Sequence, residues 1–195
     1  MATTPKRVAV QADVLRATEE LLSSGASWSE LGVERIAGGA GISRTAFYFY
    51  FRDKRELLMR LTEDVAEQLY VEADRWYSGE DDPEEEMREA LGKIAALYEQ
   101  HSPLLRVIVE VSTYDDEVAE FWRSALGRFI EATRQRIELE QGAGRAPASP
   151  ADATAFALVW MTERTFYQQV VQQPAFSRDE SVEALVGIWM RSVFG

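Results

Sequence analysis

The chain has 195 residues, one histidine and no cysteine, and 46% of its residues are hydrophobic. This composition supplies enough apolar residues for a buried core, and it excludes a disulfide framework, a thiolate nucleophile and the common zinc-binding patterns. The formal net charge is −12, which opposes nucleic-acid binding if it is spread evenly, because Lys and Arg supply much of the affinity for phosphates.

The charge is distributed unevenly along the chain. Residues 1–60 contain nine basic and seven acidic residues, a net charge of +2. Since the whole chain carries −12, residues 61–195 carry −14. A mildly basic segment followed by an acidic one predicts that only the first approaches a polyanion. No stretch has the apolar length of a signal peptide or a membrane span, so we expect a cytoplasmic protein without a membrane partner.

The N-terminal third contains three predicted short helices. Apolar residues at helical spacing indicate a helix over 8–23 that ends at Gly25, and a second over 33–39 that ends in a run of small residues. Ser43 is a favourable N-cap for a third helix, which we expect to extend to Phe51.

Longer helices are predicted for the rest of the chain. Asp53 can cap an amphipathic helix over 53–78, and Pro83 suits the first turn of the next helix. The remaining predicted helices span 83–101, a segment from Pro103, 115–141, 151–172 and 178–194. No sustained alternation of polar and apolar residues indicates a strand, so the expected fold is all-α with about nine helices.

The second and third helices have the arrangement of a helix-turn-helix. Ala40 and Gly41 allow the two helices to cross closely, and Gly41 can adopt a positive φ. In such a motif the second helix presents its first residues to the major groove, where Arg44 would read guanine or a phosphate. Spacing alone leaves a second interpretation open, in which this aromatic segment only packs against the core.

A longer motif favours the first interpretation. The segment Gly41-Ile42-Ser43-Arg44-Thr45-Ala46-Phe47-Tyr48-Phe49-Tyr50-Phe51, with Lys54 and Leu57 after it, resembles the recognition-helix signature of the TetR family of bacterial repressors. The segments Val118–Trp122, Met161–Thr165 and Ile188–Trp189 resemble the EthR-like mycobacterial members of that family. The resemblance implies three N-terminal helices, a long connecting helix and a helical core that dimerises through its last two helices.

The resemblance also implies a set of DNA contacts. The matching residues are Ser43, Arg44, Thr45, Tyr48, Phe49, Tyr50 and Lys54, with Lys6 and Arg7 as a basic arm. The family usually has threonine directly before its aromatic-tyrosine pair, whereas this chain has Ala46, so one contact is lost or shifted to Thr45. Phe47 is expected in the core, and Tyr50 is as suited to packing as to contact.

A pocket for an elongated apolar effector is implied as well. The matching residues are Met87, Trp122, Leu126, Phe129, Thr133, Val159, Thr162, Glu163, Tyr167 and Trp189. Large rings with a few polar groups among them are typical of ligand pockets. Val159 and Thr162 stand where EthR-like proteins have amide side chains, so a different ligand is expected. Glu163 and Arg164 point about 100° apart on a helix, so each is expected to have a separate partner.

The sequence thus predicts a ligand-responsive repressor that binds a palindromic DNA operator as a homodimer and is released by a small hydrophobic effector. We expect a DNA-binding domain over 1–52 and a ligand-binding and dimerisation domain over 53–195, with no cofactor, metal or catalytic residue. The apolar residues Val182, Leu185, Val186, Trp189 and Val193 recur at helical spacing and are expected at the dimer seam. The alternatives are a helical binding protein without DNA binding, or an enzyme that uses Glu163 with Arg164.

Overall fold

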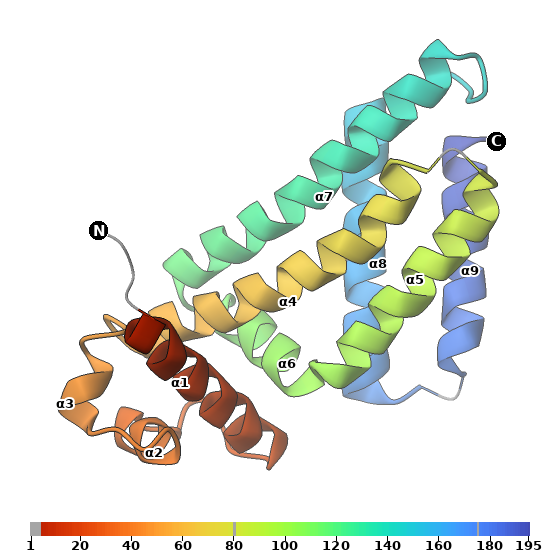
Figure 1. Cartoon of the computed structure of the whole chain (residues 1–195). Coiled ribbons are helices and arrows are strands. Elements are labelled where there is room, and N and C mark those ends of the chain that lie inside the picture. The colour runs from red at the N-terminus through yellow and green to blue at the C-terminus, as the bar shows by residue number, and fades with distance from the viewer. Residues whose placement is uncertain (1–4, 80, 175) are drawn as a thin grey trace.

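The computed structural model describes residues 5–79, 81–174 and 176–195, which form nine helices and no strand (Figure 1). The all-α prediction is confirmed. The helices are α1 (Pro5–Ser23), α2 (Val33–Gly39), α3 (Arg44–Phe47), α4 (Lys54–Tyr77), α5 (Pro83–Gln100), α6 (Ser102–Val111), α7 (Asp116–Gly142), α8 (Ala151–Gln172) and α9 (Arg178–Val193).

Side-chain caps explain where several helices begin. The carboxylate of Asp53 accepts from the Glu56 backbone N–H at 2.8 Å, and Asp115 accepts from the first backbone N–H groups of α7. Asp82 caps α5, and Pro83 lies in its first turn as the sequence predicts. Ser177 and Glu180 cap α9 reciprocally in a capping box. These local signals place most predicted helix boundaries within two residues of the observed ones.

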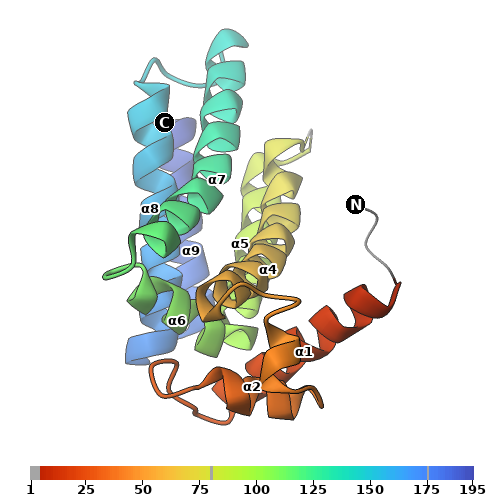
Figure 2. The ribbon, with the colours of Figure 1, turned by 90° about the vertical axis from the view of Figure 1, so that its left-hand side faces the viewer.

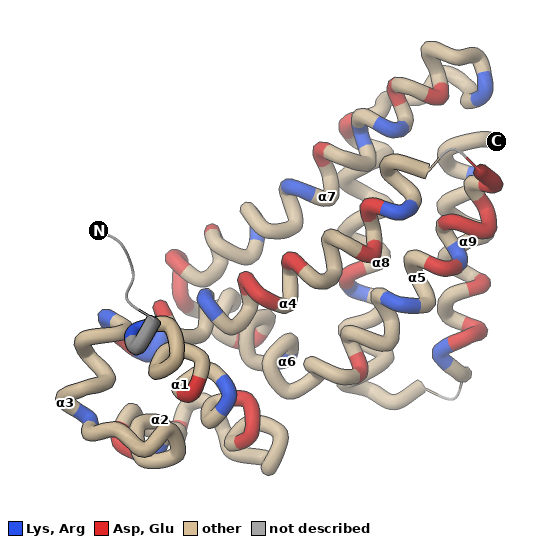
Figure 3. The backbone as a smooth tube through the Cα atoms, in the orientation of Figure 1, with Lys and Arg blue, Asp and Glu red and all other residues tan. Residues whose placement is uncertain are grey.

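Helices α1–α3, the head, lie at one end of α4–α9, the body (Figures 1 and 2). Gly41 has a φ of 68°, so the turn between α2 and α3 adopts the left-handed conformation that glycine permits. In the body, α4 and α7 run diagonally beside each other, and α5, α8 and α9 stand more upright (Figure 1). Acidic residues recur along α4, α7 and α9 of the body (Figure 3).

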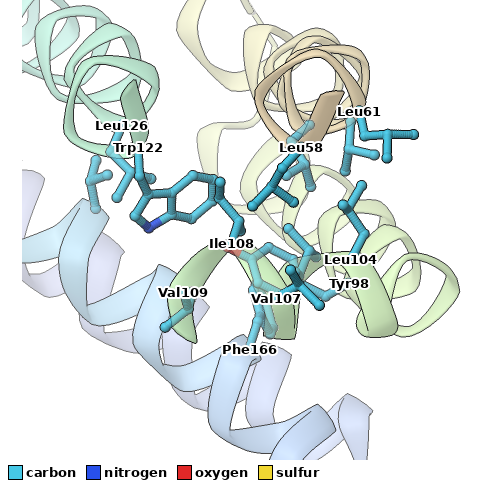
Figure 4. Close-up of a cluster of buried hydrophobic side chains, with 14 of the residues drawn as sticks. Leu58, Leu61, Tyr98, Leu104, Val107, Ile108, Val109, Trp122, Leu126 and Phe166 are labelled. Carbon is cyan, nitrogen blue, oxygen red and sulfur yellow. The ribbon is translucent and has the colours of Figure 1, made fainter. Parts of the chain in front are cut away.

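One hydrophobic core joins the head to the body. It extends from Val14 in α1 through Phe47 and Leu58 to Val193 in α9. Figure 4 shows part of it: Leu58 and Leu61 from α4, Tyr98 from α5, Ile108 from α6, Trp122 and Leu126 from α7, and Phe166 from α8.

Candidate functional site

The start of α3 presents an exposed surface at the tip of the head. Arg44 and Thr45 are exposed, Tyr48 is 48% exposed and Phe49 is 72% exposed. These four residues line one open, shallow depression. A large exposed ring next to a cationic side chain is unusual on a surface that contacts only water, so this surface is suited to a partner.

Helix α3 is shorter than predicted. The Ser43 hydroxyl accepts from the Ala46 backbone N–H at 3.1 Å, so the predicted cap is confirmed. The helix ends at Phe47, because the N–H groups of Phe49 and Tyr50 donate three residues back, to Ala46 and Phe47. This tighter turn directs Phe47 and Phe51 into the core, where both are buried. Tyr50 is half-buried.

Three of the predicted DNA-contacting residues, Arg7, Tyr50 and Lys54, are engaged within the head. The guanidinium of Arg7 lies 5.9 Å from the centre of the Tyr50 ring. The Lys54 ammonium donates to the carbonyl oxygens of Trp28, at 2.5 Å, and Leu31, at 3.1 Å, and burial lowers the pKa of Lys54. Lys54 therefore secures the loop before α2. The side chain of Lys6 lies outside the described residues.

Ion pairs fasten the junction of the head and α4 to the start of α7. Arg52 and Arg55 each donate to Glu117 at 2.6 Å, and Arg55 lies 3.3 Å from Asp115. The hydrogen bond to Glu117 raises the pKa of Arg52 further above its ordinary value. The junction of the head and α4 is thus joined to the start of α7 by ion pairs as well as through the shared core.

An apolar cavity lies inside the body. Its walls come from α4, α5, α7, α8 and α9 and consist of Ala66, Leu69, Ala73, Trp76, Tyr77, Met87, Ala90, Leu91, Ile94, Tyr98, Trp122, Ala125, Leu126, Phe129, Val159, Thr162, Glu163 and Trp189. The space open to the centre of a water-sized sphere is about 70 Å³. Binding sites for drug-sized molecules are larger, roughly 300–1,000 Å³, so side chains must move to admit such a ligand.

Eight of the ten predicted pocket residues line this cavity: Met87, Trp122, Leu126, Phe129, Val159, Thr162, Glu163 and Trp189. The other two lie behind or beside it. Thr133 is fully buried and its hydroxyl lies 3.4 Å from that of Tyr77, while Tyr167 lies under the Arg164 guanidinium at 5.0 Å. Sequence reasoning missed the contribution of α4 and of Tyr98, because their apolar stripes indicate a core as readily as a cavity.

The cavity contains few polar groups. The indole N–H of Trp189 donates to the Thr162 hydroxyl at 2.9 Å. For the described part of the chain, the buried indole nitrogen of Trp76 and both carboxylate oxygens of Glu163 have no hydrogen-bond partner. Buried polar atoms are nearly always paired in folded proteins, so groups left unpaired in a cavity wall point to a ligand or bound water.

The expectation of separate partners for Glu163 and Arg164 is wrong. The Nε of Arg164 lies 3.6 Å from Oε2 of Glu163, too far for a hydrogen bond, and no other cation within the described ranges pairs with this carboxylate. The Arg164 guanidinium also lies over the ring of Tyr167, at 5.0 Å from its centre. Burial raises the pKa of Glu163, and Arg164 opposes that shift only in part.

The prediction of which residues form the dimer seam is also wrong. Val182, Leu185, Val186, Trp189 and Val193 are all buried within this one chain. Their stripe faces α5 and α8, because α9 needs an apolar face to join its own bundle. Exposed apolar residues on these two C-terminal helices are instead Phe156, at 56% exposure, and Val171 on α8, and Ile188 on α9.

Comparisons with known proteins match both parts of the chain. Residues 14–61 match the family described as bacterial regulatory proteins of the tetR family, and residues 87–195 match the C-terminal domain of the transcriptional regulator EthR. The HTH-type transcriptional regulator EthR of Mycobacterium tuberculosis H37Rv is 31% identical over 183 residues, which are 92% of this chain and 85% of the relative. The chain belongs to the TetR family of transcriptional regulators.

Further relatives agree with this assignment. EthR of Mycolicibacterium smegmatis is 30% identical over 95% of this chain and 86% of its own length. A TetR-family regulator from Syntrophomonas wolfei superposes with a TM-score of 0.77 at 20% identity, covering 94% of this chain and 95% of the other. SmeT, a repressor from Stenotrophomonas maltophilia, gives 0.76 at 15% identity, covering 95% and 90%. These two structures show the TetR fold alone.

TetR-family proteins are transcriptional regulators rather than enzymes, so the enzyme alternative loses its support. Within residues 5–79, 81–174 and 176–195, no helix is both long and apolar enough to cross a bilayer. In those same ranges no three metal-ligating side chains gather at one place.

Proposed function

We propose that this protein is a ligand-responsive repressor that binds a palindromic operator as a homodimer and is released by a small hydrophobic effector. Residues 1–52 form the DNA-binding domain, and residues 53–195 bind the effector and dimerise. The observation that carries the proposal is the position of α4. This helix begins seven residues after the end of α3, and its second half, from Ala66 to Tyr77, forms a wall of the cavity.

The proposed DNA contacts lie at the exposed end of α3. Arg44 reads guanine or a phosphate, and Thr45, Tyr48 and Phe49 contact the groove edge and the backbone. Ser43 caps α3 by accepting from the Ala46 N–H, and so fixes the start of the helix that carries Arg44 and Thr45. Lys54 holds the loop of the head that contains Trp28 and Leu31, and so supports the DNA contacts of α3 indirectly.

The proposed dimer interface is the exposed face of α8 and α9. Phe156, Trp160, Arg164 and Tyr167 recur every three or four residues on α8, and Ile188 is exposed on α9. A two-fold axis through this face buries the same residues on both subunits. It also places two copies of α3 on one side of the dimer, as a palindromic operator requires.

Effector binding is coupled to DNA release through α4. The cavity must widen to admit a ligand, and its walls include Trp76 and Leu69 of α4. A tilt of α4 moves Lys54 and the ion-paired Arg52 and Arg55 at its other end, and with them the head. The effector therefore favours a dimer whose two α3 helices no longer fit successive major grooves.

Genomic DNA fragments retained by the purified protein identify the operator and test this proposal. Arg44→Ala is expected to weaken operator binding by roughly 1–3 kcal/mol and to relax the preference at one base pair. Arg60→Ala is the matched control, because Arg60 is exposed on α4 and pairs with Glu63 away from α3. The proposal fails if no fragment is enriched, or if both variants bind the operator like the wild type.

A further inference from the structure

The carboxylate of Glu163 occupies an unusual position in the cavity wall. Glu163 is 3% exposed, and neither of its oxygens has a hydrogen-bond partner in the described ranges. The nearest cation is Arg164, at 3.6 Å, and its side chain is 49% exposed. An ion pair with one half-exposed partner leaves most of the hydrogen-bonding capacity of this carboxylate unused.

This arrangement lowers the stability of the folded protein. Burying a carboxyl group without hydrogen bonds destabilises the folded state, and burying it ionised costs far more. Neither Thr162, whose hydroxyl already accepts from Trp189, nor any other described side chain donates to Glu163. A ligand that carries donors to this place restores the missing interactions.

The surroundings of Glu163 favour a positive charge. The rings of Tyr98, Trp122 and Trp189 line the same cavity, and aromatic faces attract cations. A hydrogen bond between an ammonium and a carboxylate is about twice as strong as a neutral one. An anionic head group is repelled by Glu163, and a neutral acceptor such as an ester finds no donor on it when it is ionised.

We propose that the effector is an elongated apolar amine whose ammonium group pairs with Glu163 while its chain lies along α4. The wall from Ala66 to Tyr77 covers twelve residues of helix, a rise of about 16 Å, which suits an extended chain. This inference rests on the proposed function, since it names the chemistry of the proposed effector.

Three probes that differ only in their head groups test the inference: n-decylamine, 1-decanol and decanoate, each below its micellar concentration. Binding is measured by calorimetry and by the fluorescence of Trp76, Trp122 and Trp189, which line the cavity. Wild-type protein is expected to bind decylamine roughly 10- to 100-fold more tightly than decanol. Decanoate is expected to bind most weakly.

Glu163→Gln keeps the shape of the side chain and removes its charge, so the ratio of decylamine to decanol affinity is expected to fall to about one. Glu67→Gln, at an exposed residue of α4 that pairs with Arg128, is expected to keep the wild-type ratio. The inference is overturned if wild-type protein does not prefer decylamine, if Glu163→Gln keeps the preference, or if none of the probes binds.

Operator binding separates this inference from the proposed function. If decanol binds and releases the operator but decylamine has no advantage, the amine assignment fails and the repressor proposal stands. If decylamine binds through Glu163 but leaves operator affinity unchanged, the site stands and the proposed control of DNA binding fails.

Discussion

Trp189 donates its indole N–H to the hydroxyl of Thr162 across 2.9 Å, and this bond joins α9 to α8 in the wall of the cavity. Both residues were expected in the pocket, and the bond explains how the large Trp189 ring is held. The ring also stands edge-on to Trp76 of α4, at 5.4 Å between centres. From its place on α9, Trp189 thus contacts both α4, which adjoins the head, and α8, which with α9 forms the proposed dimer interface.

Thr162→Val is expected to lower the free energy of unfolding by about 1–3 kcal/mol, because it leaves the buried indole N–H of Trp189 without an acceptor. Thr162→Ser keeps the hydroxyl and serves as the control. Urea unfolding followed by tryptophan fluorescence measures both variants. Equal stability of wild type and Thr162→Val would show that this bond contributes nothing to the fold.

Arg136→Met is expected to destabilise the protein strongly, by about 3–5 kcal/mol. Arg136 is buried, donates to the carbonyl oxygens of Trp76, at 2.6 Å, and Gly79, at 2.9 Å, and pairs with the buried Glu140 at 2.8 Å. Its removal leaves the end of α4 without a donor and Glu140 with only Arg145. Denaturant unfolding measures the loss.

The matched control for Arg136→Met is Arg134→Met on the same helix, because the ion pairs of Arg134 with Glu131 and Glu138 lie at the surface. Exposed pairs contribute little, so this variant is expected to unfold like the wild type. Similar losses in the two variants would contradict the assignment of Arg136 as the buried support of α4.

The stability gained by Glu163→Gln is expected to grow as the pH rises. Burial raises the pKa of Glu163 above its ordinary value of 4.5, so between that pH and the raised pKa the folded protein holds a proton that the unfolded chain has released. Wild-type stability therefore falls with rising pH through this group, whereas glutamine does not titrate. Urea unfolding of both proteins between about pH 5 and pH 8 measures the difference. A difference independent of pH would show that Glu163 ionises normally.

Phe156→Glu is expected to convert the dimer to a monomer at micromolar concentration and to weaken operator binding, because it places a charge in the proposed interface. Val71→Glu is the control, since Val71 is similarly exposed, at 57%, but lies on α4. Light scattering measures the mass of each variant. If Phe156→Glu stays dimeric, the interface lies elsewhere.

Much of the fold follows from local sequence signals. The cap at Asp53, the position of Pro83 in the first turn of α5 and the positive φ of Gly41 depend on neighbours in the chain, so these helix boundaries could be predicted. The side of a helix that faces another chain is different. An apolar stripe such as Val182–Val193 indicates burial, but it does not show whether its own bundle or a second subunit covers it.

The same limit applies to the candidate site. Eight pocket residues were predicted through family resemblance, yet the wall supplied by α4 was not, because Leu69 and Trp76 have the spacing of ordinary core residues. Lys54 has the charge of a phosphate contact, and only the three-dimensional structure shows that carbonyl oxygens of the head already hold it. The sequence around Lys54 gives no sign of that role.

Operator affinity measured while an effector fills the cavity tests the central claim most directly. Fluorescence anisotropy of labelled operator DNA, with wild-type protein titrated by decylamine or decanol, reports release, and the melting temperature reports binding. The account predicts that a ligand that raises the melting temperature weakens operator binding roughly 5- to 150-fold, and that operator DNA weakens ligand binding by the same factor. A ligand that raises the melting temperature and leaves operator affinity unchanged would contradict the claim that α4 couples the cavity to the head.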